Sequence, residues 1–334
     1  MIKFFRNIRR KLLTNNKLAK YLVYAVGEIL LIVLGILIAL NLNNRNEQRQ
    51  ADTRIELILN DLMTELLADI EETRMPMNYF ARRDSTIQLV LTDRVTFEDY
   101  AQGRIPYLNN LIRFYNRVNL TQKAYDNLIR EMDAVPDQYQ PLIKELDQLY
   151  NYNKTFVEET NEQLSDFIEE NQLYGMRNYP WFYSRNQAEW EQSITFKLED
   201  FRYKNQVNEY QNNGTYNQLR MSLMYRRKAI ECYELVASLL NKPADHESFY
   251  FDPEIASQLV GEWYVENEPE IIYSFYLESQ RLYVKTNVGN NEYEVWHLPR
   301  LNKILHENLN YGTLVEEDDQ LVIKYNYWNL RRKA

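Results

Sequence analysis

The stretch YLVYAVGEILLIVLGILIALNL, residues Tyr21–Leu42, sets the architecture of this chain of 334 residues. Its apolar run is interrupted only by Gly27, Glu28, Gly35 and Asn41. As an α-helix of about 22 residues it would be roughly 33 Å long, which is enough to cross a hydrocarbon core of about 30 Å. The sequence therefore predicts one transmembrane helix at 21–42.

The charges that flank this run predict its orientation. Residues 1–20 contain seven cations and no acidic residue, whereas Arg45 and Arg49 are accompanied by Glu47 just after the run. By the positive-inside rule, 1–20 is a basic cytoplasmic tail that faces the lipid surface, and the chain from about residue 43 onward lies on the far side of the membrane. The basic residues of the tail are Lys3, Arg6, Arg9, Arg10, Lys11, Lys17 and Lys20.

A cleaved signal peptide is the competing interpretation, because it also combines a basic start with an apolar run. The run is longer than the ~7–15 apolar residues of such a peptide. Asn41–Arg45 follows it in place of a small-residue cleavage site. We therefore expect an uncleaved, single-pass anchor.

One face of the predicted span favours contact with another helix. Gly35 and Ala39 are four residues apart, and Gly27 adjoins Glu28. Small residues at this spacing allow two membrane helices to approach closely, although such pairs also arise by chance. A carboxylate in lipid costs on the order of 3 kcal/mol, which a bond to a second helix would offset. We expect pairing with a second copy or a partner membrane protein; the alternatives for Glu28 are a protonated side chain reaching toward the interface and a place on an ion path.

The composition excludes several classes of function. The formal net charge is −9, and the exported part is more acidic still because the basic tail remains behind, so a nucleic-acid partner is excluded. The single cysteine, Cys232, permits no internal disulfide and is expected to be a small buried side chain. Eight glycines against 27 tyrosines disfavour phosphate-binding loops and favour long regular elements.

Residues 43–243 are expected to form a helical domain. Apolar residues recur at steps of three and four from Ala51 to Ile70, where Met75-Pro76 ends the pattern, and again over 141–171. Two later helices, 190–210 and 215–240, are expected on either side of a turn at Asn212–Gly214. Several long amphipathic helices with short breaks predict an antiparallel bundle.

Aromatic residues gather in the connection after 141–171. Tyr179, Trp181, Phe182 and Tyr183 surround Pro180. Such a cluster either plugs the end of a bundle or contacts a partner, since Trp and Tyr dominate the anchors of interfaces. These four residues are our candidate partner patch.

Residues 254–334 change to a period of two, which indicates strands. The clearest are 271–277 and 321–325, and the pattern predicts a small antiparallel β meander or barrel. Gly261-Glu262-Trp263 resembles the Gly-x-Trp entry of lipocalin-like barrels, which implies a chain that bends at Gly261 and a Trp263 that closes the barrel end. A ligand in the interior is one possibility; for so short a chain we expect a filled core.

The N-terminus reads MIKFFRNIRRKLL at 1–13 and AVGEILLIVLGILIALN at 25–41, and the later chain contains TQKAYDNL at 121–128 and Leu149-Tyr150. The two N-terminal stretches, and more loosely the two later ones, resemble a family of single-span envelope proteins found in Bacteroidota to which no activity is assigned. The resemblance implies a Gram-negative inner membrane, with residues 43–243 as a helical periplasmic domain and 254–334 also in the periplasm, and it implies no catalytic residues.

No catalytic, cofactor or metal motif stands out. His246, His297 and His306 lack metal-ligand spacing, and a pair between His297 and Glu294 is the one acid–base candidate, with a solvent-facing or satisfied histidine as the ordinary alternative. We therefore expect a membrane-anchored α+β protein that is not an enzyme and needs no cofactor. Its expected role is an anchored interaction or scaffold component; the alternative is a periplasmic sensor of a small molecule or lipid that works through a partner.

Overall fold

The computed structural model describes residues 17–132, 135–136, 139–184, 186–244, 246, 249–289 and 291–333. The chain divides into two compact units, Met1–Leu59 with Asn127–Asp137, and Asn60–Asp126 with Gln138–Ala334. We call the latter the second unit. The predicted tail residues Lys3, Arg6, Arg9, Arg10 and Lys11 lie outside the described residues.

Helix α2 runs without interruption over Lys17–Glu72. No proline occurs between these residues, so no backbone donor is missing from the helix. Its most apolar 18 residues have a mean hydropathy of 2.5, and none of them is buried. By length and composition, this helix near the N-terminus is the one among the described residues that is long and apolar enough to cross a membrane.

Two side chains stabilise the C-terminal end of α2, which itself belongs to the second unit. Thr73 Oγ1 donates a hydrogen bond of 2.6 Å to the carbonyl oxygen of Ile70, and the Arg226 guanidinium donates to the same oxygen. These donors satisfy a carbonyl that the helix itself leaves without a partner. Helix α3 then begins at Arg74, with Pro76 in its first turn, where a missing backbone donor is tolerated.

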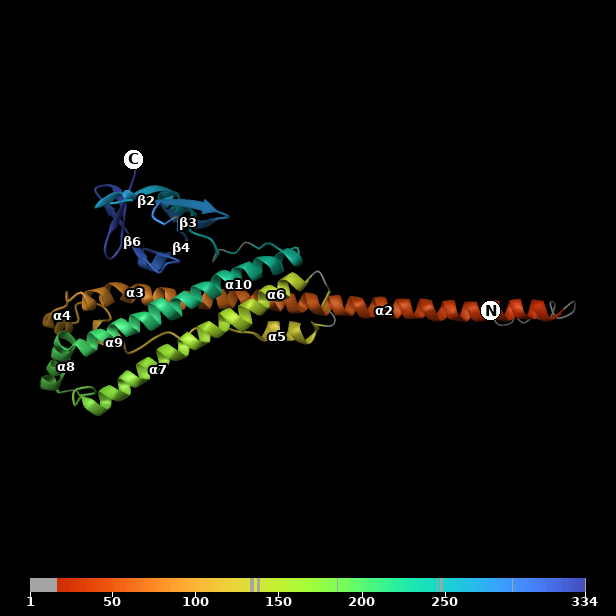
Figure 1. Ribbon diagram of the computed structural model, residues 1–334, viewed down its shortest axis with the longest axis horizontal. Helices are drawn as coiled ribbons and strands as arrows, with labels where there is room; N and C mark the ends of the chain where they lie inside the picture. The colour runs from red at the N-terminus through yellow and green to blue at the C-terminus, as the bar shows by residue number, and fades with distance from the viewer. Residues whose placement is uncertain are drawn as a thin grey trace. The chain divides into compact units, whose positions relative to one another are not determined.

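The remaining helices form a predominantly helical middle region, in which the long helices α7 and α10 pack against each other (Figure 1). Their bounds are α3 Arg74–Leu91, α4 Phe97–Gln102, η1 Leu108–Asn110, α5 Lys123–Arg130, α6 Gln140–Gln148, η4 Leu149–Asn153, α7 Lys154–Asn178, α8 Gln187–Glu199, α9 Phe201–Gln211, η5 Asn212–Leu219, α10 Arg220–Leu239 and α11 Pro253–Leu259.

Two expected features of this region are wrong. The expected turn at Asn212–Gly214 is a π-helical stretch, η5, which continues α9 into α10. Gly214 is required by packing, because a Cβ atom there would lie 2.3 Å from Cε1 of Phe80. The helix expected at 190–210 is instead broken at Asp200, whose side chain accepts a 2.9 Å hydrogen bond from the backbone N–H of Arg202 and caps α9.

The C-terminal strands close into a barrel in which each strand pairs antiparallel with the next and β1 pairs with β8. This confirms the expected antiparallel β structure. The turn between β6 and β7 uses Asp318 and Asp319, both in the left-handed region. The strands are β1 Gly261–Val265, β2 Glu268–Glu278, β3 Arg281–Thr286, β4 Glu292–Leu298, β5 Lys303–His306, β6 Tyr311–Glu317, β7 Gln320–Lys324 and β8 Asn329–Arg332.

Side chains fill the barrel. Trp263 is fully buried, and its Nε1 donates a 2.7 Å hydrogen bond to the carbonyl oxygen of Leu259 at the end of α11. Gly312 of β6 lies close to the paired strand β7, because a Cβ atom at this position would be 2.6 Å from Cγ2 of Ile323. His306 is also buried and shares a 2.7 Å hydrogen bond with the hydroxyl of Tyr325.

The barrel and the helices of the second unit share one apolar core. Trp296, Leu298 and Tyr311 from the barrel belong to the same buried cluster as Met77 and Phe80 of α3. Polar contacts border it: Lys303 Nζ donates to the carbonyl oxygen of Ala81 at 2.8 Å, Asn326 Nδ2 to Asp84 Oδ2 at 2.8 Å, and the Tyr327 hydroxyl to Gln88 Oε1 at 2.5 Å. The barrel is therefore packed onto α3.

Candidate functional site

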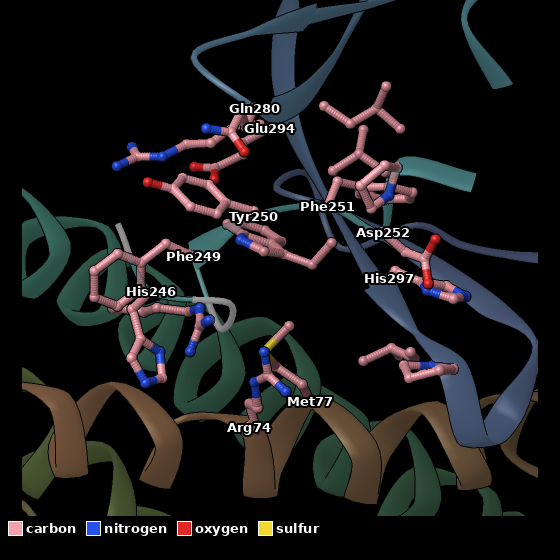
Figure 2. A pocket seen from close by; sticks show the side chains of 18 of the residues that line it. Arg74, Met77, His246, Phe249, Tyr250, Phe251, Asp252, Gln280, Glu294 and His297 are labelled. Atoms are coloured by element: carbon pink, nitrogen blue, oxygen red, sulfur yellow. The ribbon is translucent and has the colours of Figure 1, made fainter. Parts of the chain in front are cut away.

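A cleft of about 740 Å³ lies where the barrel meets the helices (Figure 2). Its lining comes from the start of α3, from α10, from the connection at 246–253 and from strands β3 and β4. We call it the barrel cleft. The side chains that bear on its chemistry are Glu71, Arg74, Arg226, His246, Tyr250, Asp252, Gln280, Arg281, Glu294 and His297.

The described lining of the barrel cleft carries as many arginines as carboxylates: Arg74, Arg226 and Arg281 against Glu71, Asp252 and Glu294. Arg74 Nε lies 3.5 Å from Glu71 Oε2, and Arg281 forms an ion pair with Glu234, which lies outside the lining. Burial raises the pKa of Glu294, although Arg281 and Arg226 oppose that shift. Each charge therefore lies near an opposite charge, an arrangement that stabilises a buried interface without requiring a ligand.

Arg226 is the most deeply buried of these cations, with 2% of its surface exposed. Burial lowers its pKa to about 10, so it remains charged at neutral pH. Besides the Ile70 carbonyl, its Nη1 reaches Thr73 Oγ1 at 3.2 Å. Its geometry is that of a cation that joins α10 to the end of α2.

The structure does not bring Glu294 and His297 together as an acid–base pair. Figure 2 shows Glu294 beside Gln280 and His297 beside Asp252, toward opposite sides of the cleft. Three residues apart on β4, they project from opposite faces of the strand. The ring of His297 stacks on Phe251 with centroids 5.5 Å apart, and burial lowers its pKa while Asp252 opposes the shift.

The predicted partner patch surrounds a second hollow. Tyr179 and Trp181 stack with centroids 4.6 Å apart, and Phe196 of α8 lies 4.8 Å and 5.2 Å from their respective centroids. These three side chains are half-buried, as is Phe182, whereas Tyr183 is 58% exposed. A cavity of about 260 Å³, which we call the ring pocket, is bordered by Tyr179, Trp181, Phe182, Phe196, Trp190 and Tyr203, whereas Tyr183 is not part of its lining.

Phe182 is positioned by a glycine. A Cβ atom at Gly175 in α7 would lie 2.2 Å from Cε2 of Phe182, so the ring rests directly on the helix backbone. A larger residue at this position would force the ring to move. Gly175 therefore sets the shape of one wall of the ring pocket.

Two cations that the sequence did not indicate as site residues also line the ring pocket. Arg113 lies 5.6 Å and 5.5 Å from the ring centroids of Phe182 and Tyr183. Lys197 Nζ lies 5.3 Å from the ring centroid of Tyr100 and 3.4 Å from the carbonyl oxygen of Asn109. Within the part of the chain that the structure describes, neither cation has an ion pair, and the lining contains no Asp or Glu.

Burial and, to a smaller extent, the nearby charge of Arg113 together lower the pKa of Lys197 to about 8. A fraction of the lysines is therefore neutral just above physiological pH. The neighbouring Arg202 differs, because its guanidinium Nε binds both carboxylate oxygens of Asp200 at 2.9 Å and 3.1 Å. Among the described lining residues of the ring pocket, Arg113 and Lys197 have no carboxylate partner of this kind.

The predicted helix-pairing residues all lie on α2. Glu28, Gly35 and Ala39 are exposed and Gly27 is half-buried. A Cβ atom at Gly27 or Gly35 would meet no described atom within 4 Å. Lys17 and Lys20 also belong to α2, although their side chains are not described.

Comparisons of the chain with protein-family models, with curated proteins and with solved structures found no match. Within the described ranges, no group of three or more His, Cys, Asp or Glu side chains is placed to hold a metal ion. Cys232 is buried, and burial raises the pKa of its thiol to about 12. A function must therefore be argued from the exposed span, the barrel cleft and the ring pocket.

Proposed function

We propose that this protein is a single-pass, non-enzymatic anchor of a bacterial inner membrane that serves as an interaction or scaffold component. The observation that carries the proposal is the apolar segment of α2, of which no residue is buried and whose mean hydropathy is 2.5. Exposed apolar surface of this length is unfavourable in water and favourable in a bilayer. Gly27, Glu28, Gly35 and Ala39 lie on this segment and would face lipid or a second helix.

The periplasmic placement of the helices and barrel rests on the charges around the span. The tail cations favour the cytoplasmic side, and the acidic remainder suits a soluble exported surface. The resemblance to single-span Bacteroidota envelope proteins supports the same setting. A non-enzymatic role is supported by the buried Cys232, whose raised pKa disfavours a thiolate nucleophile.

The first experiment measures association of the full-length protein in a mild detergent. Glu28→Leu and Gly35→Leu are compared with wild type and with Val33→Leu, an apolar exchange at an exposed position of the same helix. We expect a discrete oligomer or a defined co-purifying membrane protein that the first two substitutions abolish and the control retains. If all four proteins are lone monomers by mass determination, pairing through the span is refuted.

Orientation is tested separately by labelling. Lys285→Cys places a thiol at an exposed position of β3, and the native Cys232 is too buried to contribute a strong background. We expect a membrane-impermeant thiol reagent to label the variant in spheroplasts without lysis. Labelling only after lysis would place the barrel in the cytoplasm and overturn the proposed topology.

The barrel cleft favours a second candidate function, the binding of a small molecule or lipid that is then signalled through a partner. Its volume of about 740 Å³ is within the range of ligand sites. Asn78→Trp would fill part of it from α3. If native mass spectrometry finds a co-purified molecule that this variant loses, the sensor function replaces the scaffold function; an empty wild-type protein argues against it.

A further inference from the structure

The ring pocket combines aromatic walls with positive charge in a chain that is otherwise acidic. The net charge of the whole protein is −9, yet the described lining of the pocket carries Arg113 and Lys197 and no carboxylate. Bringing two cations near each other without an anion is unfavourable. The rings of Phe182, Tyr183 and Tyr100 offset part of this cost, and a bound anion would offset it directly.

The aromatic side chains indicate what else the ligand carries. Tyr179, Trp181 and Phe196 present ring faces and edges around the cavity, which suits a flat or apolar group. The volume of about 260 Å³ limits the ligand to a small one. Apolar walls with a few convergent polar groups are the usual composition of small-molecule sites.

We propose that the ring pocket binds a small organic acid, with its ring or short apolar chain against Trp181 and Phe196 and its anionic group toward Arg113 and Lys197. This site is distinct from the span and from the barrel cleft. Arg113 would supply a fixed charge and a planar set of donors, and Lys197 a second charge from α8. Neither side chain would need to leave an internal ion pair to bind the ligand.

The proposal predicts a specific dependence of affinity on pH. Burial lowers the pKa of Lys197 to about 8, so this side chain loses its charge above that pH. Burial raises the pKa of Tyr100 to about 12 and that of Tyr203 well above its ordinary value, and it raises the pKa of Tyr179 as well. Among the described groups around the lysine, Lys197 is therefore the one that changes charge between pH 7 and about pH 10.

The experiment uses the full-length protein in nanodiscs of uncharged phosphatidylcholine. The probe is 4-(trifluoromethyl)phenylacetate, observed by fluorine NMR, and it is compared with the uncharged 4-(trifluoromethyl)phenylacetamide. We expect the acid to bind at millimolar concentration or below and the amide at least about tenfold more weakly. Equal affinities for acid and amide, or no binding of the acid at millimolar concentration, would overturn the proposal.

Substitutions then assign the site. Lys197→Met and Arg113→Met should each weaken binding of the acid at least about tenfold, while Lys123→Met and Arg220→Met, at exposed positions away from the pocket, should leave it unchanged. Circular dichroism verifies that each variant is folded. Lys197→Arg serves as a second readout, because it should retain binding at pH 10 where wild type has lost it. Binding that persists in Lys197→Met, or a pH profile that Lys197→Arg shares with wild type, would refute the assignment.

Discussion

The barrel cleft and the ring pocket are two hollows of the second unit that treat charge in opposite ways. In the barrel cleft, Arg281 is paired with Glu234, and Glu294 lies near Arg281 and Arg226. In the ring pocket, Arg113 and Lys197 face aromatic and amide side chains and no described carboxylate. The larger hollow is thus electrically balanced and the smaller one is not.

This difference distinguishes charges that stabilise the fold from charges that are available to bind a ligand. A buried ion requires compensation, and at the barrel cleft the fold supplies it, for example through the ion pair between Arg281 of the barrel and Glu234 of α10. The ring pocket leaves the requirement open. Size alone would have favoured the barrel cleft as a binding site, whereas charge balance favours the ring pocket for an anionic ligand.

His306 in the barrel is a third buried polar site, and its hydrogen-bond partner, the hydroxyl of Tyr325, is neutral. The prediction for this residue has the largest expected effect on stability. Burial lowers its pKa to about 3, whereas in the unfolded chain the imidazole titrates near 6.5. The unfolded state therefore binds more protons between these values, and stability falls by about 1.4 kcal/mol per pH unit as pH drops below about 6.5. Urea unfolding at pH 7, 5.5 and 4.5 measures this slope.

The control for this prediction removes both partners of the hydrogen bond. A variant that combines His306→Leu with Tyr325→Phe removes the donor and the acceptor of this bond together, so neither partner is left unpaired by the change. Its unfolding free energy should depend less on pH over the same interval. If the acid slopes of variant and wild type coincide, carboxylates elsewhere cause the loss, and the buried imidazole does not.

Breaking the balanced set should destabilise the protein. Arg226→Met removes the donor to the Ile70 carbonyl and leaves Glu294 with less compensation, and we expect a loss of about 3 kcal/mol in unfolding free energy. Arg227→Met is the matched control, because its ion pair with Glu307 is 55% and 32% exposed and should contribute less than about 1 kcal/mol. A loss below about 1 kcal/mol for Arg226→Met would mean that the cleft charges are not a compensated structural set.

Removing a charge from the ring pocket should change the unfolding free energy in the opposite direction and stabilise the protein. The pKa of Lys197 is lowered to about 8 from a value near 10.4 in the unfolded chain, so its charge destabilises the fold fully below pH 8 and progressively less toward pH 10.4. Lys197→Met should raise the unfolding free energy by about 2 kcal/mol at pH 7. The difference from wild type should shrink as the pH approaches 10. A variant less stable than wild type at pH 7 would show that the lysine has a structural role.

The sequence predicts the long-range plan of the molecule better than its sites. An uninterrupted apolar run and a period of two are properties of neighbouring residues, so α2 and strands such as β2 are readable from local pattern. The turn predicted at Asn212–Gly214 is wrong. A glycine after two asparagines is typical of a turn, whereas here the missing side chain of Gly214 leaves room for the ring of Phe80 from a distant helix. That requirement is set by tertiary packing alone.

The ring pocket shows the same limit. Its rings at 179–183 are adjacent in sequence and were recognised as a group, but Arg113 and Lys197 arrive from the loop after η1 and from α8. Neither residue has a local pattern that distinguishes it from the 39 lysines and arginines of the chain. What distinguishes them is that both line one aromatic pocket whose described lining contains no carboxylate, and that is a property of the fold.

The smallest expected effect tests whether the pocket is shaped for a ligand. Gly175→Ala adds a methyl group where Phe182 lies, so the ring must turn into or away from the cavity. Higher helix propensity offsets the strain by up to about 1 kcal/mol, so stability should change by less than that amount. The affinity for 4-(trifluoromethyl)phenylacetate should nevertheless fall several-fold, whereas Gln163→Ala, an exposed exchange on the same helix, should leave it unchanged. An unaltered affinity in Gly175→Ala would mean that Phe182 is not a wall of the binding site, and the anion would then be held by Arg113 and Lys197 without a shaped apolar pocket.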